Sequence, residues 1–102
     1  MKYLKKFESN YDIINVKKYV LWKMKHFIFI LEVTKIYDNL VHMRRLYKYS
    51  DEYDNISPTD IMEFDFSYED ISKKVIYSSD NLNDCLDLNL LAASFITDKY
   101  NI

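Results

Sequence analysis

The chain has 102 residues, a formal net charge of −2, no glycine, one proline and one cysteine. This length is enough for one domain with a buried core, so we expect a single domain over 1–102. Without glycine, the chain cannot form the Gly-rich phosphate-binding loops or tight catalytic turns that need glycine's backbone freedom. The lone Cys85 excludes an intramolecular disulfide and is typical of a reducing compartment.

No part of the chain has the hydropathy of a membrane segment. The longest wholly apolar run, 27–31, is too short to span a bilayer. The first residues also lack the apolar core of a signal peptide. We therefore expect a soluble, cytoplasmic protein with no membrane partner.

Apolar side chains at helical spacing mark the first fifteen residues. Leu4, Phe7, Tyr11 and Ile14 recur every three or four positions, which predicts a helical arm over 1–15. The opening from Met1 to Ser9, rich in Lys and aromatic residues, resembles the starts of small uncharacterised proteins from AT-rich bacteriophages. That resemblance implies a phage or mobile-element origin, and therefore the host cell cytoplasm, and it carries no mechanism.

β-Branched and aromatic residues dominate 16–49, which predicts an antiparallel β-meander. Strands are expected over 16–24, 26–37 and 40–49. Lys25-His26 and Asp38-Asn39 form the two short turns between them, and Asp and Asn tolerate the left-handed backbone of a tight turn. A strongly bent meander looks like the start of a small SH3-like barrel. The expected fold class is therefore α+β, built on a β-meander or on such a barrel.

The two-residue turn at Asp38-Asn39 sets the predicted register of the central hairpin. It places Glu32 opposite Arg45, Ile30 opposite Tyr47, Leu31 opposite Leu46, Ile36 opposite Val41, and His42 opposite Lys35. Alternation then assigns Phe27, Phe29, Leu31, Val33 and Leu46 to one face, and Ile28, Ile30, Ile36, Val41, Met43, Tyr47 and Tyr49 to the other. Since neither face is plainly polar, we expect both to be at least partly covered, by helices, by barrel curvature or by another chain.

The second half of the chain begins with an acidic loop, predicted over 50–60 around Pro58, and continues as a strand plus helices over 61–102. Residues 61–66 alternate as an amphipathic strand. Ser67 with Asp70 resembles a capping box for a short helix over 68–73. Residues 74–77 fit either a strand or an extension of that helix.

A final helix is expected to run to about residue 96, with Ser79 or Asp80 as its cap. Its apolar side chains cover much of its circumference, which is typical of a helix that is buried or contacts something on two sides. Core packing and helix-mediated dimerisation both fit this pattern.

No constellation has the spacing of a catalytic, cofactor-binding or metal-binding site. His26 and His42 lie in no zinc-ligand pattern. The acids after Ser50 lack the spacing and the central glycine of a calcium loop. Cys85 lies on the apolar stripe of the last helix with no base placed beside it. We expect no cofactor and no metal, and a protein that acts by binding and not by catalysis.

Charge is divided unevenly along the chain. Residues 1–48 hold eleven Lys and Arg against four acids, and residues 49–102 hold three against twelve. An acidic face would steer the protein onto a basic protein surface, as nucleic-acid-mimicking inhibitors do. With the phage resemblance, this implies an inhibitor of a host defence nuclease, such as an anti-CRISPR protein. The residues expected to bind the partner are Asp51, Glu52, Asp54, Glu63, Asp65, Glu69, Asp70, Asp84 and Asp87.

Two alternatives stay open. In one, the basic half binds nucleic acid, with cations on phosphates and an aromatic ring stacking on bases. The residues of that site would be Lys17, Lys18, Lys23, Lys25, Arg44, Arg45, Lys48 and Trp22. In the other, the protein is a structural homo-oligomer, for example a homodimer, that packs through its apolar faces. Folding could also place basic strands beside acidic helices and so neutralise the asymmetry.

Overall fold

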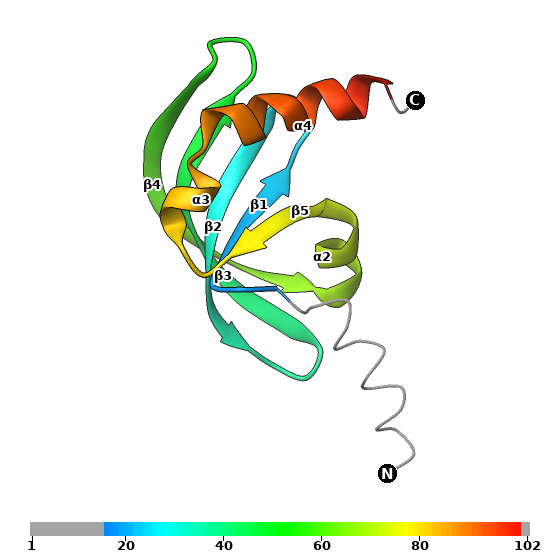
Figure 1. Ribbon diagram of the computed structural model, residues 1–102. Helices are drawn as coiled ribbons and strands as arrows, with labels where there is room; N and C mark the ends of the chain where they lie inside the picture. Colours follow the sequence, from blue (N-terminus) through cyan, green and yellow to red (C-terminus); the bar gives the residue numbers. More distant parts are fainter. Residues whose placement is uncertain (1–15, 101–102) are drawn as a thin grey trace.

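The structure is a computed structural model that describes residues 16–100, with side chains described up to Phe95. The helical arm predicted over 1–15 lies outside the described residues. Within them, five strands form one antiparallel sheet with helices on both sides (Figure 1). The predicted α+β meander is therefore confirmed.

The strands follow one another across the sheet, except for the last. The elements are β1 (Tyr19–Lys23), β2 (Phe27–Ile36), β3 (Leu40–Ser50), β4 (Asn55–Ser67), α2 (Tyr68–Lys74), β5 (Val75–Ser79), α3 (Leu82–Cys85) and α4 (Leu88–Tyr100). The sheet order is β4-β3-β2-β1-β5. Because α2 carries the chain from one edge strand to the other and β4 and β5 do not pair, the SH3-like barrel closure is not seen (Figure 1).

Both predicted two-residue turns are present. The Met24 N–H donates to the Phe27 carbonyl at 2.8 Å, and the Tyr37 N–H donates to the Leu40 carbonyl at 2.8 Å. Residues 74–77, which the sequence left open, divide between the end of α2 and the start of β5. Ser67 caps α2, since its Oγ accepts from the Asp70 N–H at 3.2 Å, as predicted.

The register of the central hairpin differs from the prediction in its middle section. Ile36 pairs with Val41 and Ile30 with Tyr47, as expected, but Glu32 pairs with Arg44 and not with Arg45. Two irregularities cause the shift: Thr34 is an extra residue on β2, and Leu46 is an extra residue on β3. The second bulge restores the register that the first one displaces.

The two bulges separate apolar from charged side chains. On the turn side of the Leu46 bulge, Val41 and Met43 join the face of Leu31, whereas the predicted register had placed them with Ile28 and Ile30. A regular hairpin would have buried charged side chains of β3 under the helices. The bulges avoid the free-energy cost of that burial. The predicted face assignment is therefore wrong for Val41 and Met43.

The acidic loop predicted over 50–60 is shorter in the structure. Only 51–54 form the turn, and β4 begins at Asn55 and contains Pro58. A proline is tolerated there because β4 is an edge strand and its outer N–H positions need no partner. Asp54 takes the left-handed conformation of the turn, with φ at 50°, in a chain that has no glycine for it.

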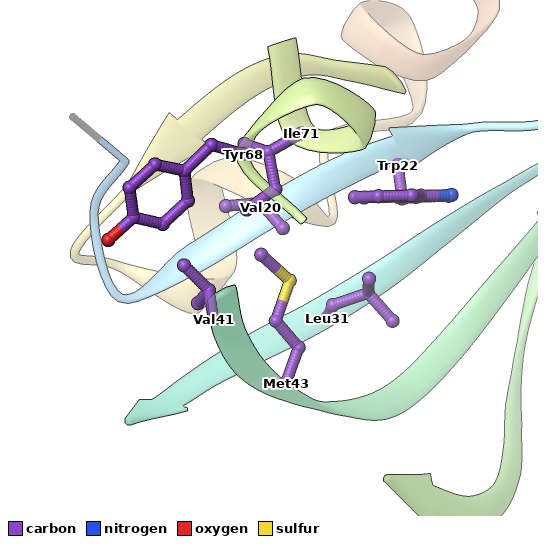
Figure 2. Close-up of a cluster of buried hydrophobic side chains, with 7 residues drawn as sticks. All are labelled: Val20, Trp22, Leu31, Val41, Met43, Tyr68 and Ile71. Atoms are coloured by element: carbon purple, nitrogen blue, oxygen red, sulfur yellow. The ribbon is translucent and has the colours of Figure 1, made fainter. Parts of the chain in front are cut away.

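One core lies on the face of the sheet that we call the inner face. Side chains from β1, β2, β3 and α2 converge there (Figure 2); they are Val20, Trp22, Leu31, Val41, Met43, Tyr68 and Ile71. Trp22 of β1 also stacks on Phe66 of β4, with ring centroids 4.0 Å apart. In a flat sheet, those strands would lie about 14 Å apart. The sheet is therefore curled toward the inner face.

A second core lies on the opposite, outer face under α3 and α4. Its buried members are Leu21, Ile28, Ile30, Tyr49, Cys85 and Leu91. Both faces are thus at least partly covered by helices, which was one of the expected explanations for their apolar character. The single predicted final helix is wrong, since Asn81 caps α3 and Asp87 starts α4. The Asp87 carboxylate accepts from the Asn89 N–H at 2.9 Å and so opens a new helix.

Candidate binding groove on the inner face

Helix α2 covers only one half of the inner face. Beyond it, two adjoining hollows of about 700 Å³ and about 470 Å³ share Phe27 and Lys48 in their walls. Phe29 and Arg45 line the second hollow, and Phe29 also packs against the inner core. We call the two hollows together the inner-face groove. It is the open continuation of the curled sheet surface.

The floor of the groove consists of two phenylalanine rings, each with a cation over it. The rings of Phe27 and Phe29 stack with centroids 6.4 Å apart. The Lys48 ammonium lies 4.7 Å from the Phe27 centroid, and the Arg45 guanidinium carbon lies 5.3 Å from the Phe29 centroid. These are cation–π distances, so the two cations are held in place by the floor.

The bulge at Leu46 brings the two cations together. Residues three apart on a regular strand point to opposite faces. Arg45 and Lys48 share the inner face because the extra residue between them reverses the alternation. The groove therefore depends on an irregularity that strand periodicity alone does not contain.

Neither groove cation forms an ion pair within the part of the chain that the structure describes. The Arg45 Nε donates to the Thr59 hydroxyl at 3.1 Å. On the outer face, by contrast, the half-buried Arg44 pairs with the Glu32 carboxylate. Arg45 and Lys48 are half-buried positive charges held by rings and a hydroxyl, without a carboxylate to neutralise them.

Acidic side chains also line the groove. Asp51 and Glu52 lie at the end formed by the β3–β4 turn, together with Tyr53, which is 73% exposed. Asp60 of β4 lines the second hollow, between Pro58, which pairs with Tyr47, and Met62, which pairs with Arg45. The groove is therefore lined by charges of both signs.

A second polar cluster lies on the outer face around His42. Its Nε2 is 2.5 Å from the Glu63 carboxylate, and its Nδ1 is 2.6 Å from the Asp65 carboxylate. The hydrogen bond with Glu63, and next that with Asp65, raises the pKa of His42 above its usual 6.5. Among the described residues, no group of His, Cys, Asp and Glu is arranged to hold a metal ion.

The acids predicted to bind a partner lie in several separate places. Asp51, Glu52 and Asp54 form the β3–β4 turn, Glu63 and Asp65 flank His42, and Glu69 and Asp70 lie in the first turn of α2. The remaining two take part in local hydrogen bonds. Asp84 accepts from the Ser79 hydroxyl at 2.7 Å, and Asp87 accepts from the backbone at the start of α4. Of these acids, only Asp51 and Glu52 line the groove, and Asp54 accepts instead from the Tyr49 hydroxyl at 2.6 Å.

The basic residues predicted for nucleic acid are also dispersed. Lys18 lies on the outer face, 3.8 Å from the Glu32 carboxylate that also binds Arg44. Lys23 reaches α4, where it donates to the Ser94 carbonyl at 3.4 Å. Lys17 and Lys25 are exposed outside the groove lining. Only Arg45 and Lys48 meet in the groove.

Trp22 cannot serve as the base-stacking ring that the sequence analysis assigned to it. The residue is only 5% exposed, and its ring stacks on Phe66 within the inner core. The aromatic residues that line the groove are Phe27, Phe29 and Tyr53, and the predicted alternation had placed Phe27 and Phe29 only on one face of the hairpin. Phe27 and Phe29 line the groove because they lie at the strand end farthest from α2. The sequence does not predict this position, because it depends on the tertiary structure.

Cys85 is fully buried in the outer core. Burial, and next the nearby charge of Asp84, raises the pKa of its thiol to about 11. The thiol is therefore protonated at neutral pH and packs as a small apolar side chain.

Comparison of the chain with protein-family models, with curated proteins and with solved structures gave no match. Within the described residues, none of the helices combines the length and the apolar character needed to cross a membrane.

Proposed function

We propose that this protein is a small binding protein that captures a protein partner through the inner-face groove. The observation that carries the proposal is the half-covered inner face, where Phe27 and Phe29 form an apolar floor under Arg45 and Lys48. An apolar floor with charges of both signs around it is the composition of a protein interface, in which aromatic residues and Arg supply most of the binding energy.

The proposed class of partner is based on the resemblance of the first nine residues to bacteriophage proteins. The resemblance of 1–9 to small bacteriophage proteins supports a partner among host defence proteins. An inhibitor of a defence nuclease, such as an anti-CRISPR protein, acts by occupying its target and needs no catalytic group of its own. The acids of the β3–β4 turn, Asp51 and Glu52, would then face basic side chains of that target.

The test is capture of a host protein by the purified chain, followed by titration of the isolated partner. A Lys48→Glu variant places a negative charge at the centre of the groove, and Lys17→Glu makes the same change at an exposed site away from the groove. We expect Lys48→Glu to weaken binding about tenfold or more, as for a central interface residue. Lys17→Glu should bind like the wild type. Equal effects of the two variants on the titration would contradict the proposal.

A second candidate is single-stranded nucleic acid, favoured by Arg45 and Lys48 above phenylalanine rings. Titration of a labelled oligothymidylate against salt tests it. Two phosphates neutralised on a single strand predict a slope of about −1.4 for the logarithm of the binding constant against the logarithm of salt concentration. Absence of binding at low salt removes this candidate.

A further inference from the structure

Strand β4 has an open edge. It is the last strand of the sheet (Figure 1), and among the described residues it pairs only with β3. Its residues 62–67 pair with β3 without irregularity. In a regular antiparallel ladder, alternate residues direct their N–H and C=O groups away from the neighbouring strand. This stretch, which we call the β4 edge, can therefore accept another strand.

The other edges of the sheet are less regular. Strand β5 has only 5 residues, and Ile76 is an extra residue in its ladder with β1. In the first half of β4, the three residues from Thr59 to Ile61 stand opposite the single Leu46. Short length and bulges protect an edge from pairing. The β4 edge is therefore the best place on the described sheet for an added strand.

The side chains of the β4 edge define the chemistry of that strand. Glu63 and Asp65 lie on the outer face beside His42, and their side chains are 60% and 54% exposed. A carboxylate has more acceptor positions than one histidine contact uses. Phe64 and Phe66 lie on the inner face, with ring centroids 5.6 Å apart. A neighbouring strand therefore needs cations on the outer face and apolar side chains on the inner face.

We propose that the β4 edge binds an extended segment of the partner, with alternating basic and apolar residues, as a sixth strand of the sheet. This proposal rests on the proposed function and names the way in which the partner is held. Strand β4 contains three acids and no Lys or Arg, so its charge complements a basic segment. Asp60 lines the groove and Met62 begins the β4 edge, at most about 7 Å away. One partner can therefore contact both.

A second copy of this chain does not suit the β4 edge. Directly opposite residues of an antiparallel pair share a face, so a symmetric pair of β4 strands must be centred on a residue that meets its own copy. Centred on Glu63 or Asp65, the pair sets that carboxylate against itself, and centred on Phe64 it sets Glu63 against Asp65. Like charges directly opposite each other destabilise a sheet. A strand with lysines at those positions is attracted instead.

Three labelled peptides test the proposal. The first is Thr-Val-Lys-Val-Lys-Val-Thr, the second has the same sequence with every Val and Lys N-methylated, and the third has Glu in place of both Lys. We expect fluorescence anisotropy at low salt to give at least about tenfold weaker binding of the second peptide, because it cannot donate ladder hydrogen bonds. The third should also bind at least about tenfold more weakly, since its carboxylates lie beside Glu63 and Asp65. Binding of either as tight as that of the first peptide would overturn the proposal.

Amide hydrogen exchange locates the bound peptide. With the first peptide, the amides of 62–67 that point away from β3 should exchange at least about tenfold more slowly, and those of β5 should be unchanged. Absence of protection in 62–67 contradicts the proposal. Protection of 62–67 that rises with protein concentration, without any peptide, also contradicts it and identifies a second copy as the occupant.

Charge variants test the role of the acids. Glu63→Gln with Asp65→Asn should weaken binding of the first peptide at least about fivefold. Asp38→Asn with Glu69→Gln, the same charge change at exposed positions outside β4, should not weaken it. Equal effects of the two double variants count against the proposal. The N-methylated peptide is compared on the wild type, so that comparison stands even if the β4 variant does not fold.

The outcomes separate this proposal from the proposed function. If Lys48→Glu weakens capture of the protein partner but the first peptide does not protect 62–67, the added strand is wrong and the proposed function stands. If the first peptide protects 62–67 and capture is lost in the β4 double variant but not in Lys48→Glu, the partner is held at the β4 edge, and the groove has no part in binding.

Discussion

At the scale of single residues, His42 is held between two carboxylates, so its protonation affects the structure around it. Glu63 and Asp65 of β4 face its two ring nitrogens, Lys35 of β2 lies directly opposite on the ladder, and Arg44 follows on its own strand. A neutral imidazole has one N–H and can donate to only one of the two carboxylates. Hydrogen bonds to both carboxylates at once therefore require the protonated ring, and this agrees with the raised pKa of His42.

The raised pKa of His42 predicts that stability falls as pH rises. The folded state holds the proton more tightly than the unfolded chain, so this stabilisation is complete below pH 6.5 and is lost as the pH rises through the folded-state pKa. Urea unfolding of the wild type and of His42→Gln, measured across this range, should show a decline in the wild type that the variant lacks. His26→Gln, in the exposed β1–β2 turn, is the control. Parallel pH profiles for wild type and His42→Gln would disprove this role.

At the scale of elements, the paired bulges of β2 and β3 decide which residues share a face. They place Glu32 beside Arg44 on the outer face and free Arg45 for the groove. Single-residue propensities do not predict such bulges. The bulges stabilise the fold by placing apolar and charged side chains on the appropriate faces, and helices distant in sequence cover those faces. The groove and the outer ion-pair network are consequences of one change in register.

Charge exchange tests this register. Glu32→Arg alone sets like charges beside Arg44 and should lower the urea midpoint. Adding Arg44→Glu should recover much of the loss, because the pair is restored with reversed polarity. Adding Arg45→Glu instead should recover little, since Arg45 points to the inner face. Better recovery with Arg45→Glu would favour the regular hairpin register over the bulged one.

At the scale of the whole molecule, one sheet separates two cores and couples them. Trp22 lies in the inner core under α2, and Leu91 of α4 lies in the outer core. Adjacent residues of β1, such as Val20 and Leu21, belong to different cores. Loss of packing on one face should therefore be transmitted to the other through the shared strands, as in a cooperative single domain.

This coupling predicts the effect of Leu91→Ala. Removing a fully buried leucine from the outer core should destabilise the protein by about 2–5 kcal/mol. Fluorescence of Trp22, the only tryptophan, reports on the inner core, and far-ultraviolet circular dichroism reports on the whole sheet. Both urea transitions should shift together to lower midpoints. If the Trp22 transition stays at its wild-type midpoint, the two faces unfold separately.

Local sequence signals were sufficient for the first three strands, the two short turns between them and the short helix α2. Asp38-Asn39 and Lys25-His26 end β-prone runs, and Ser67 offers its hydroxyl to the start of α2, so each feature follows from residues close together in the chain. The boundary of β4 was missed because Pro58 is a turn signal that an edge strand tolerates, and edge position is a property of the assembled sheet.

The sequence by itself determined that the chain would form a meander with two apolar faces, because strand periodicity and turn chemistry act over a few residues. Only the tertiary structure decided which half of the inner face α2 covers, where the bulges fall, and hence which cations remain without a carboxylate. Those choices depend on contacts between residues far apart in the chain, such as Trp22 with Phe66 and Arg45 with Thr59. Local sequence patterns do not predict the free energy of such contacts.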